Sequence, residues 1–163
     1  MTKDDIRHLF EFDQWATNVQ YGVITKLPPE QYARNLGASY GSIHGTLVHI
    51  YGAQKTWFSR WNGVSPTKFP DPEETANLQM LMDRWNALRE QQNEFVRGLT
   101  DDRLQQHLAF KTFKGDPSSL PLWQQIQHVV NHGSYHRGQI TSMLRQLDVA
   151  PVGTDLITYY RSL

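Results

Sequence analysis

Hydrophobic residues recur at intervals of three and four positions along four long stretches of the chain. This spacing places the apolar side chains on one side of an α-helix. The first stretch ends at Pro28-Pro29 and the second at Asn62-Gly63, and both pairs are typical of helix ends. The predicted helices cover about Thr2–Lys26, Ser42–Trp61, Glu73–Gly98 and Leu120–Leu147.

The segments between these helices carry different signals. Pro66, Pro70 and Pro72 indicate a rigid crossover between the second and third helices. Apolar and polar residues alternate over His107–Phe113, just before the turn signal Lys114–Pro117, which is typical of a strand or hairpin arm. The pattern therefore predicts an all-α protein, a four-helix bundle with a long crossover between helices 2 and 3 and a short β-hairpin arm before helix 4.

Composition narrows the class of function. A chain of 163 residues fits one domain over 1–163. Sixteen Lys and Arg residues balance 16 Asp and Glu residues, which argues against nucleic acid and anionic membranes as partners. The sequence has neither a run of about 18 apolar residues nor a signal peptide at its charged start, so we expect a cytoplasmic protein. Because cysteine is absent, we expect histidine to be the side chain that binds any metal ion.

Three of the seven histidines are spaced by four along the predicted fourth helix. His128, His132 and His136 therefore rise along one side of it, and such spacing can bring two imidazoles to one metal ion. At about 100° per residue they lie roughly 130°, 90° and 50° from the centre of the apolar stripe, so His132 and His136 flank the core. Spacing alone leaves open whether this pair binds a metal or has a structural role, because a site needs a third ligand.

The third ligand must come from elsewhere in the chain. The candidates are the carboxylates and His8, His44, His49 and His107. Periodicity in the second helix favours His44 as the core-facing residue and places His49 to the side. This discrimination is weak, because Trp57 and other residues extend the apolar arc toward His49.

Two long stretches of the sequence resemble a known protein family. They are SIHGTLVHIYGAQKTWFSRW at 42–61 and HVVNHGSYHRGQITSMLRQL at 128–147, followed by Pro151 and Asp155-Leu156. Together they resemble the DinB-like (DinB/YfiT-type) family of metal-binding four-helix-bundle proteins. The resemblance covers nearly the whole chain in order, including the extended stretch before the last helix.

The resemblance implies a metal site and a choice of reactions. His49, His132 and His136 would bind a divalent metal ion, with Zn or Ni expected, and His49 thereby replaces His44 as the third ligand. Three imidazoles leave an open position for water, a thiol or a substrate, which is typical of a catalytic site. Relatives resemble thiol S-transferases and hydrolases, so we expect a metal-dependent enzyme acting on a small-molecule substrate, with a low-molecular-weight thiol as a candidate. The alternative is a non-catalytic binding module with a structural or vestigial metal site.

Several other residues are candidates for a role near this site. Unless Asp155 folds back, no carboxylate lies beside the histidine pair, which argues against protease-like hydrolysis. Arg137 is the candidate catalytic residue, binding an anionic substrate group, or else it forms a surface ion pair. Asn131 or Gln139 could orient a ligand. The aromatic residues Trp57, Trp61 and Tyr135 either line a pocket or belong to the core or a dimer interface. The resemblance is also compatible with a homodimer, and the family's name refers to induction by DNA damage, which implies a stress response and not DNA binding.

Overall fold

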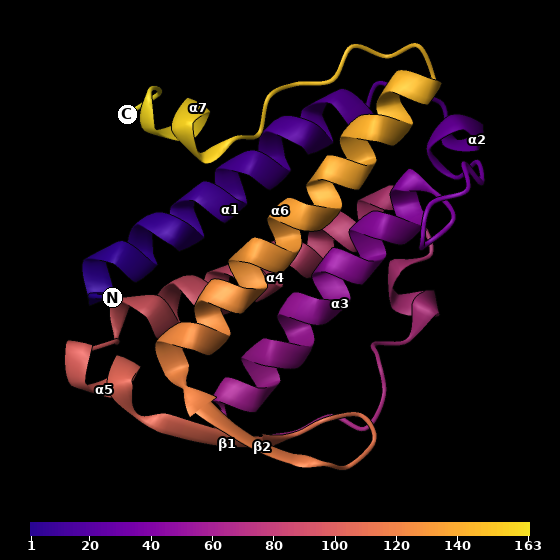
Figure 1. The fold of residues 1–163 in the computed structure, drawn as a ribbon. Helices are drawn as coiled ribbons and strands as arrows, with labels where there is room; N and C mark the ends of the chain where they lie inside the picture. The colour runs from indigo at the N-terminus through magenta and orange to yellow at the C-terminus, as the bar shows by residue number, and fades with distance from the viewer. The chain divides into compact units, whose positions relative to one another are not determined.

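The computed structural model describes residues 1–163, except for the side chain of Pro72. Its helices are α1 (Lys3–Ile24), α2 (Pro29–Tyr32), α3 (Ile43–Trp61), α4 (Leu78–Arg97), α5 (Asp101–Gln105), α6 (Leu122–Gln146) and α7 (Leu156–Tyr160), with a 3-10 turn η1 at Pro72–Thr75. The strands are β1 (His107–Lys111) and β2 (Pro117–Pro121). The all-α class, with four long helices, a long crossover and a hairpin before the last long helix, is confirmed (Figure 1). None of the described helices is long and apolar enough to cross a membrane.

Two of the predicted helix starts were too early, and local capping explains one of them. Glu73 belongs to the 3-10 turn, whose start is capped by the carboxylate of Asp71. Helix α4 begins at Leu78 instead, because the side chain of Asn77 accepts a hydrogen bond from the backbone N–H of Met80 at 2.9 Å.

The hairpin explains the other early start. Strand β1 pairs antiparallel with β2, and His107 lies opposite Pro121 while Lys111 lies opposite Pro117. The turn between them uses Gly115 at φ +91°, a conformation that favours glycine. Because β2 runs to Pro121, helix α6 begins at Leu122 and not at Leu120.

The chain divides into two compact units, which are described separately. The first unit is Met1–His8 with Tyr51–Val129, and the second is Leu9–Ile50 with Val130–Leu163. Helices α1, α3 and α6 each contribute residues to both units. The organisation of residues 1–163 as a single domain stays a prediction from chain length.

The first unit is built around Trp85 of α4, which is fully buried. Its indole Nε1 donates a hydrogen bond to Oε1 of Gln54 at 2.8 Å, so the polar end of the ring is satisfied inside the core. A second aromatic group joins α3 to α4, where the rings of Trp61 and Phe95 stack at 5.8 Å. These contacts fix the last turns of α3 against α4.

The second unit packs α1 beside α6, as Figure 1 shows. A buried cluster of Phe12, Ala16, Val130 and Tyr159 brings the C-terminal helix α7 onto these two helices. Deeper in the unit, Gln20 Nε2 donates a hydrogen bond to the backbone carbonyl of Arg137 at 3.0 Å. The second unit therefore holds in place the part of α6 that carries His132 and His136.

Candidate metal centre

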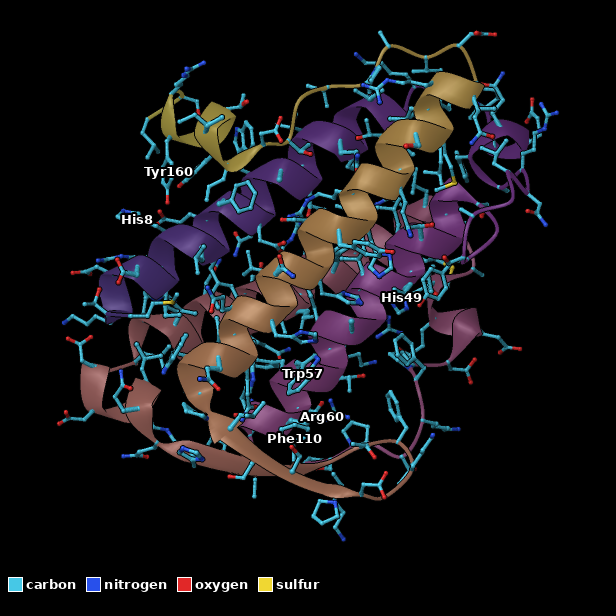
Figure 2. The ribbon with its side chains drawn as sticks, viewed as in Figure 1. His8, His49, Trp57, Arg60, Phe110 and Tyr160 are labelled. Carbon is cyan, nitrogen blue, oxygen red and sulfur yellow. The ribbon has the colours of Figure 1, made fainter. Side chains whose placement is uncertain are left out.

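Three histidines of the second unit converge on one point, and His49 is the member of this group that Figure 2 labels. His49 comes from α3, while His132 and His136 lie one turn apart on α6. The Nε2 atom of His132 is 3.0 Å from Nε2 of His49 and 3.1 Å from Nε2 of His136. All three ligand atoms lie within 4.8 Å of one another. The structure thus brings together the three residues that the family resemblance implied.

The spacing of these nitrogens fits a shared cation. Two imidazoles bound to one tetrahedral Zn²⁺ at about 2.0–2.1 Å have nitrogens roughly 3.3 Å apart. The observed separations of 3.0 and 3.1 Å are close to that value. Hydrogen bonding accounts for them less well, because the Nε2 of a neutral His132 either carries one proton or accepts through one lone pair. An all-imidazole donor set also suits Zn and Ni.

The ring of His136 is oriented by a neighbour on its own helix. Its Nδ1 lies 2.8 Å from Oε1 of Gln139, an oxygen that can only accept, so Nδ1 carries the proton. The lone pair of Nε2 is then available to a metal ion. Gln139 therefore takes the orienting role predicted for it, whereas Asn131, the other candidate, is exposed.

His49 is held in its neutral form. Burial, and after it the charge of His136, lower the pKa of His49 from 6.5 to about 4. A neutral imidazole is the form that binds metals, so the ring needs no deprotonation at neutral pH.

Tyr40 is the neighbour of the site that sequence reasoning missed. Its ring stacks on His49 with centroids 3.7 Å apart and planes 14° apart, and it meets His136 edge-on at 5.4 Å. The turn that carries it needs Gly41 at φ +74° and packs so closely on α3 that a Cβ at Gly45 would lie 2.2 Å from the Tyr40 carbonyl oxygen. The Gly-Ser pair after Tyr40 signals a turn and a helix start, but it does not reveal the stacking partner.

The other histidines lie outside this group. His44, which periodicity favoured, packs near the ring of Tyr32 at 6.1 Å and is not a member of the three-histidine group. His128 belongs to the first unit, where its ring meets Trp57 at 5.3 Å. Among the described residues, His8 and His107 likewise lie outside the group.

Arg137 has a different position from the one expected of a catalytic residue. Its side chain is 1% exposed, and Nη1 forms an ion pair with Asp13 of α1 at 2.7 Å. Nη1 also donates to Thr17 at 3.3 Å and Nη2 to Ser134 at 3.0 Å. The ion pair is therefore internal and not on the helix surface, and the guanidinium is not presented to an anionic substrate.

The remaining candidates divide between core and surface. Trp61 is 3% exposed and stacks within the first unit, so it is a core residue. Tyr135 is 66% exposed and its ring lies edge-on to His136 at 5.0 Å, so it borders the candidate site. Asp155 is exposed just before α7 and lies outside the three-histidine group.

Comparison with known proteins decides the family. The family model described as DinB family matches residues 1–162. The chain belongs to the DinB family. It is 27% identical over 158 residues to Protein DinB of Bacillus subtilis strain 168, covering 93% of this chain and 91% of that protein. The crystal structure of a DinB-like protein from Bacillus cereus ATCC 10987 has the same fold, with 20% identity, a TM-score of 0.57 and coverage of 86% of this chain and 91% of that one.

Proposed function

We propose that this DinB-family protein is a metal-dependent enzyme whose His49, His132 and His136 hold a divalent cation, with Zn or Ni as the expected metals. The convergence of three imidazole nitrogens from two helices carries the proposal. Supporting it, Gln139 fixes the tautomer of His136, and burial keeps His49 neutral.

The donor set favours thiol chemistry over hydrolysis. When bound, the cation would supply a Lewis acid that lowers the pKa of a thiol or a water. Within the residues that the structure describes, the three-histidine group includes no carboxylate, so no side chain of the group is a general base for water. A thiol, whose ordinary pKa of about 8.5 is already near neutrality, depends less on such a base. Thiol S-transfer to a small electrophile is therefore our first assignment and hydrolysis the second.

The chain itself supplies binding and orientation, and the substrate supplies the sulfur. Because the sequence has no cysteine, the thiol must be a separate low-molecular-weight molecule. Tyr40, which is 41% exposed, and Tyr135 flank the histidines and offer apolar surface to it. Thiol chemistry on electrophiles would also suit the stress-response role that the family resemblance implies.

Metal titration tests the site. Untagged protein is stripped with a chelator and titrated with Zn²⁺ and Ni²⁺, and we expect one ion per chain. Replacing His49, His132 or His136 by Ala should each weaken binding at least 100-fold, whereas His44→Ala, a histidine of the same α3 helix outside the group, should leave affinity unchanged. Equal binding by the wild type and a variant lacking all three histidines would overturn the assignment.

Cobalt substitution tests the reaction class against a non-catalytic binding module. A Co²⁺ absorption spectrum that changes when a small thiol is added would support an open position used for chemistry. A spectrum that no thiol or azide alters would identify a closed structural site and favour the binding module. Arg137 enters neither assignment, because its guanidinium is engaged with Asp13.

A further inference from the structure

A buried arginine lies in the first unit, near the end of α3. Arg60 is 7% exposed, and Figure 2 shows it near Trp57 and Phe110. The guanidinium carbon lies 4.5 Å from the ring centroid of Trp57, 5.0 Å from that of Phe110 and 5.5 Å from that of Phe113. Trp57 and Phe110 also meet edge-to-face at 4.9 Å, so the rings form a continuous aromatic cluster.

Arg60 is a buried cation without a counter-ion among the side chains that the structure describes. Among the described residues, no carboxylate lies within ion-pair distance of it, and its Nε is buried without a hydrogen-bond partner. Its terminal nitrogens likewise have no hydrogen-bond partner in the described part of the chain, but they are not fully buried. Burial lowers the pKa of Arg60, with no opposing effect of a nearby acid. A guanidinium nine-tenths buried normally has an anionic partner, because desolvating an uncompensated charge is costly.

Groups beside Arg60 suit an anion that has an apolar part. The ring centroid of His128 lies 5.3 Å from that of Trp57. Burial, and after it the positive charge of Arg60, lower the pKa of His128. Phe113, at the hairpin turn, is 42% exposed and offers an aromatic face to a ligand. The cluster thus combines a planar cation, a second nitrogen donor and an apolar wall.

We infer that Arg60, with Trp57, Phe113 and His128, forms a binding site for a small organic carboxylate. A carboxylate matches the planar fork of a guanidinium and carries the single negative charge that one arginine neutralises. A phosphate dianion would leave one charge uncompensated among aromatic rings. Because Arg60 is only 7% exposed, its guanidinium offers too little surface for the face of a folded protein, whereas a small carboxylate needs little area. The inference does not depend on a metal ion at the three histidines.

Benzoate is the probe, because it joins a carboxylate to an aromatic ring. Binding is measured by ligand-observed NMR on chelator-treated wild-type protein, so that a metal-bound carboxylate cannot contribute. We expect benzoate to bind at least tenfold more tightly than benzamide, its neutral isostere, and more tightly than inorganic phosphate. We also expect intermolecular NOEs from benzoate to the Trp57 indole. Equal affinity for benzoate and benzamide, tighter binding of phosphate, or NOEs only to other residues would overturn the inference.

Variants locate the charge that is recognised. Arg60→Gln should abolish the preference for benzoate over benzamide, and Arg60→Lys, which keeps the charge but lacks the planar fork, should reduce it in part. Arg97→Gln, a matched change of an exposed arginine on α4, should leave it unchanged. If Arg60→Gln does not fold, the ratio of the wild-type affinities for benzoate and benzamide, together with the Arg60→Lys variant, still tests the site. Loss of the benzoate preference in Arg97→Gln would contradict the site.

Discussion

Gly133 shows how one missing side chain makes room for a buried ion pair. A Cβ at this position would lie 2.7 Å from Oδ1 of Asp13 and 3.0 Å from Nη1 of Arg137. In most helix interiors a Gly→Ala change stabilises, but here it pushes apart two charged groups that cannot reach water. We expect Gly133→Ala to lower the free energy of unfolding by about 1–3 kcal/mol, measured by urea denaturation.

The matched control lies on the same helix. Nothing lies within 4 Å of a Cβ built at Gly138, so Gly138→Ala should raise the free energy of unfolding by about 0.5–1 kcal/mol. If both variants are stabilised to the same extent, the close packing around Gly133 is not a constraint in solution.

Asp13 is expected to be the most sensitive position of the ion pair. Asp13→Asn keeps the shape but leaves the guanidinium of Arg137 buried without its counter-charge. We expect a loss of about 3–5 kcal/mol in the free energy of unfolding, measured by thermal and urea denaturation. The exposed pair of Asp4 and Arg7 gives the comparison, and Asp4→Asn should change stability by less than about 1 kcal/mol. Similar losses in the two variants would mean that the buried pair is solvated.

The sequence could not reveal this role of Arg137. Its position beside His136 suggested a substrate-binding group, whereas its partner Asp13 lies 124 positions away in the chain. Periodicity assigns a residue to a face of its own helix, but the partner that faces it is set by tertiary packing. The same limit applies to Tyr40, whose stacking on His49 depends on a turn of the chain before α3.

Among the elements, the turn before α3 is the one that shapes the candidate metal centre. Gly45 lets the Tyr40 carbonyl approach the helix, and the hydroxyl of Ser42 accepts a hydrogen bond from the Gly45 N–H at 3.0 Å. We expect Gly45→Ala to move the turn and separate Tyr40 from His49. The ring-current shift of the His49 imidazole should then decrease in NMR spectra, and metal affinity should fall about tenfold, as when a neighbour that orients a ligand is lost.

Gly22→Ala on α1 is the control for this change, because nothing lies within 4 Å of a Cβ there. It should leave both the His49 shift and the metal affinity unaltered. A Gly45→Ala protein with an unshifted His49 resonance would show that the Tyr40 stack does not depend on the close approach.

The long helices were predictable and several of their ends were not, for a physical reason. Periodic burial extends over many residues, so α1, α3, α4 and α6 are evident from the pattern. The predicted start at Glu73 does lie in a helical segment, but that segment is the short 3-10 turn, and Asn77 starts α4 afterwards. Competing capping residues a few positions apart cannot be ranked by periodicity.

At the scale of the whole molecule, the order of burial along α6 was predicted correctly. His136 is 5% exposed, His132 is partly buried and His128 is exposed, which is the order that the helical angles gave. Periodicity could not identify His49, the third member of the group. The hydrophobic arc of α3 favoured His44, whereas the choice of His49 depends on where α6 presents His132. The family resemblance supplied that information because it compares whole chains.

The depressed pKa of His49 makes the metal-free protein sensitive to acid. Folding holds this pKa at about 4, while in the unfolded chain it returns to about 6.5. Between these values the unfolded state binds the additional proton, so the stabilising contribution is complete above pH 6.5 and decreases as the pH falls toward 4. We therefore expect the free energy of unfolding in chelator to decrease from pH 7 to pH 4.5.

Two variants assign this acid sensitivity to the candidate metal centre. His49→Gln removes the titrating group, so its free energy of unfolding should decrease less between pH 7 and pH 4.5 than that of the wild type, measured by urea denaturation in chelator. His44→Gln, on the same helix but outside the three-histidine group, should keep the wild-type pH dependence. Saturating Zn²⁺ should raise stability at pH 7 and do so less at pH 4.5, because protons compete with the metal for the imidazoles. Identical pH dependence in His49→Gln and the wild type would show that His49 is not held neutral by folding.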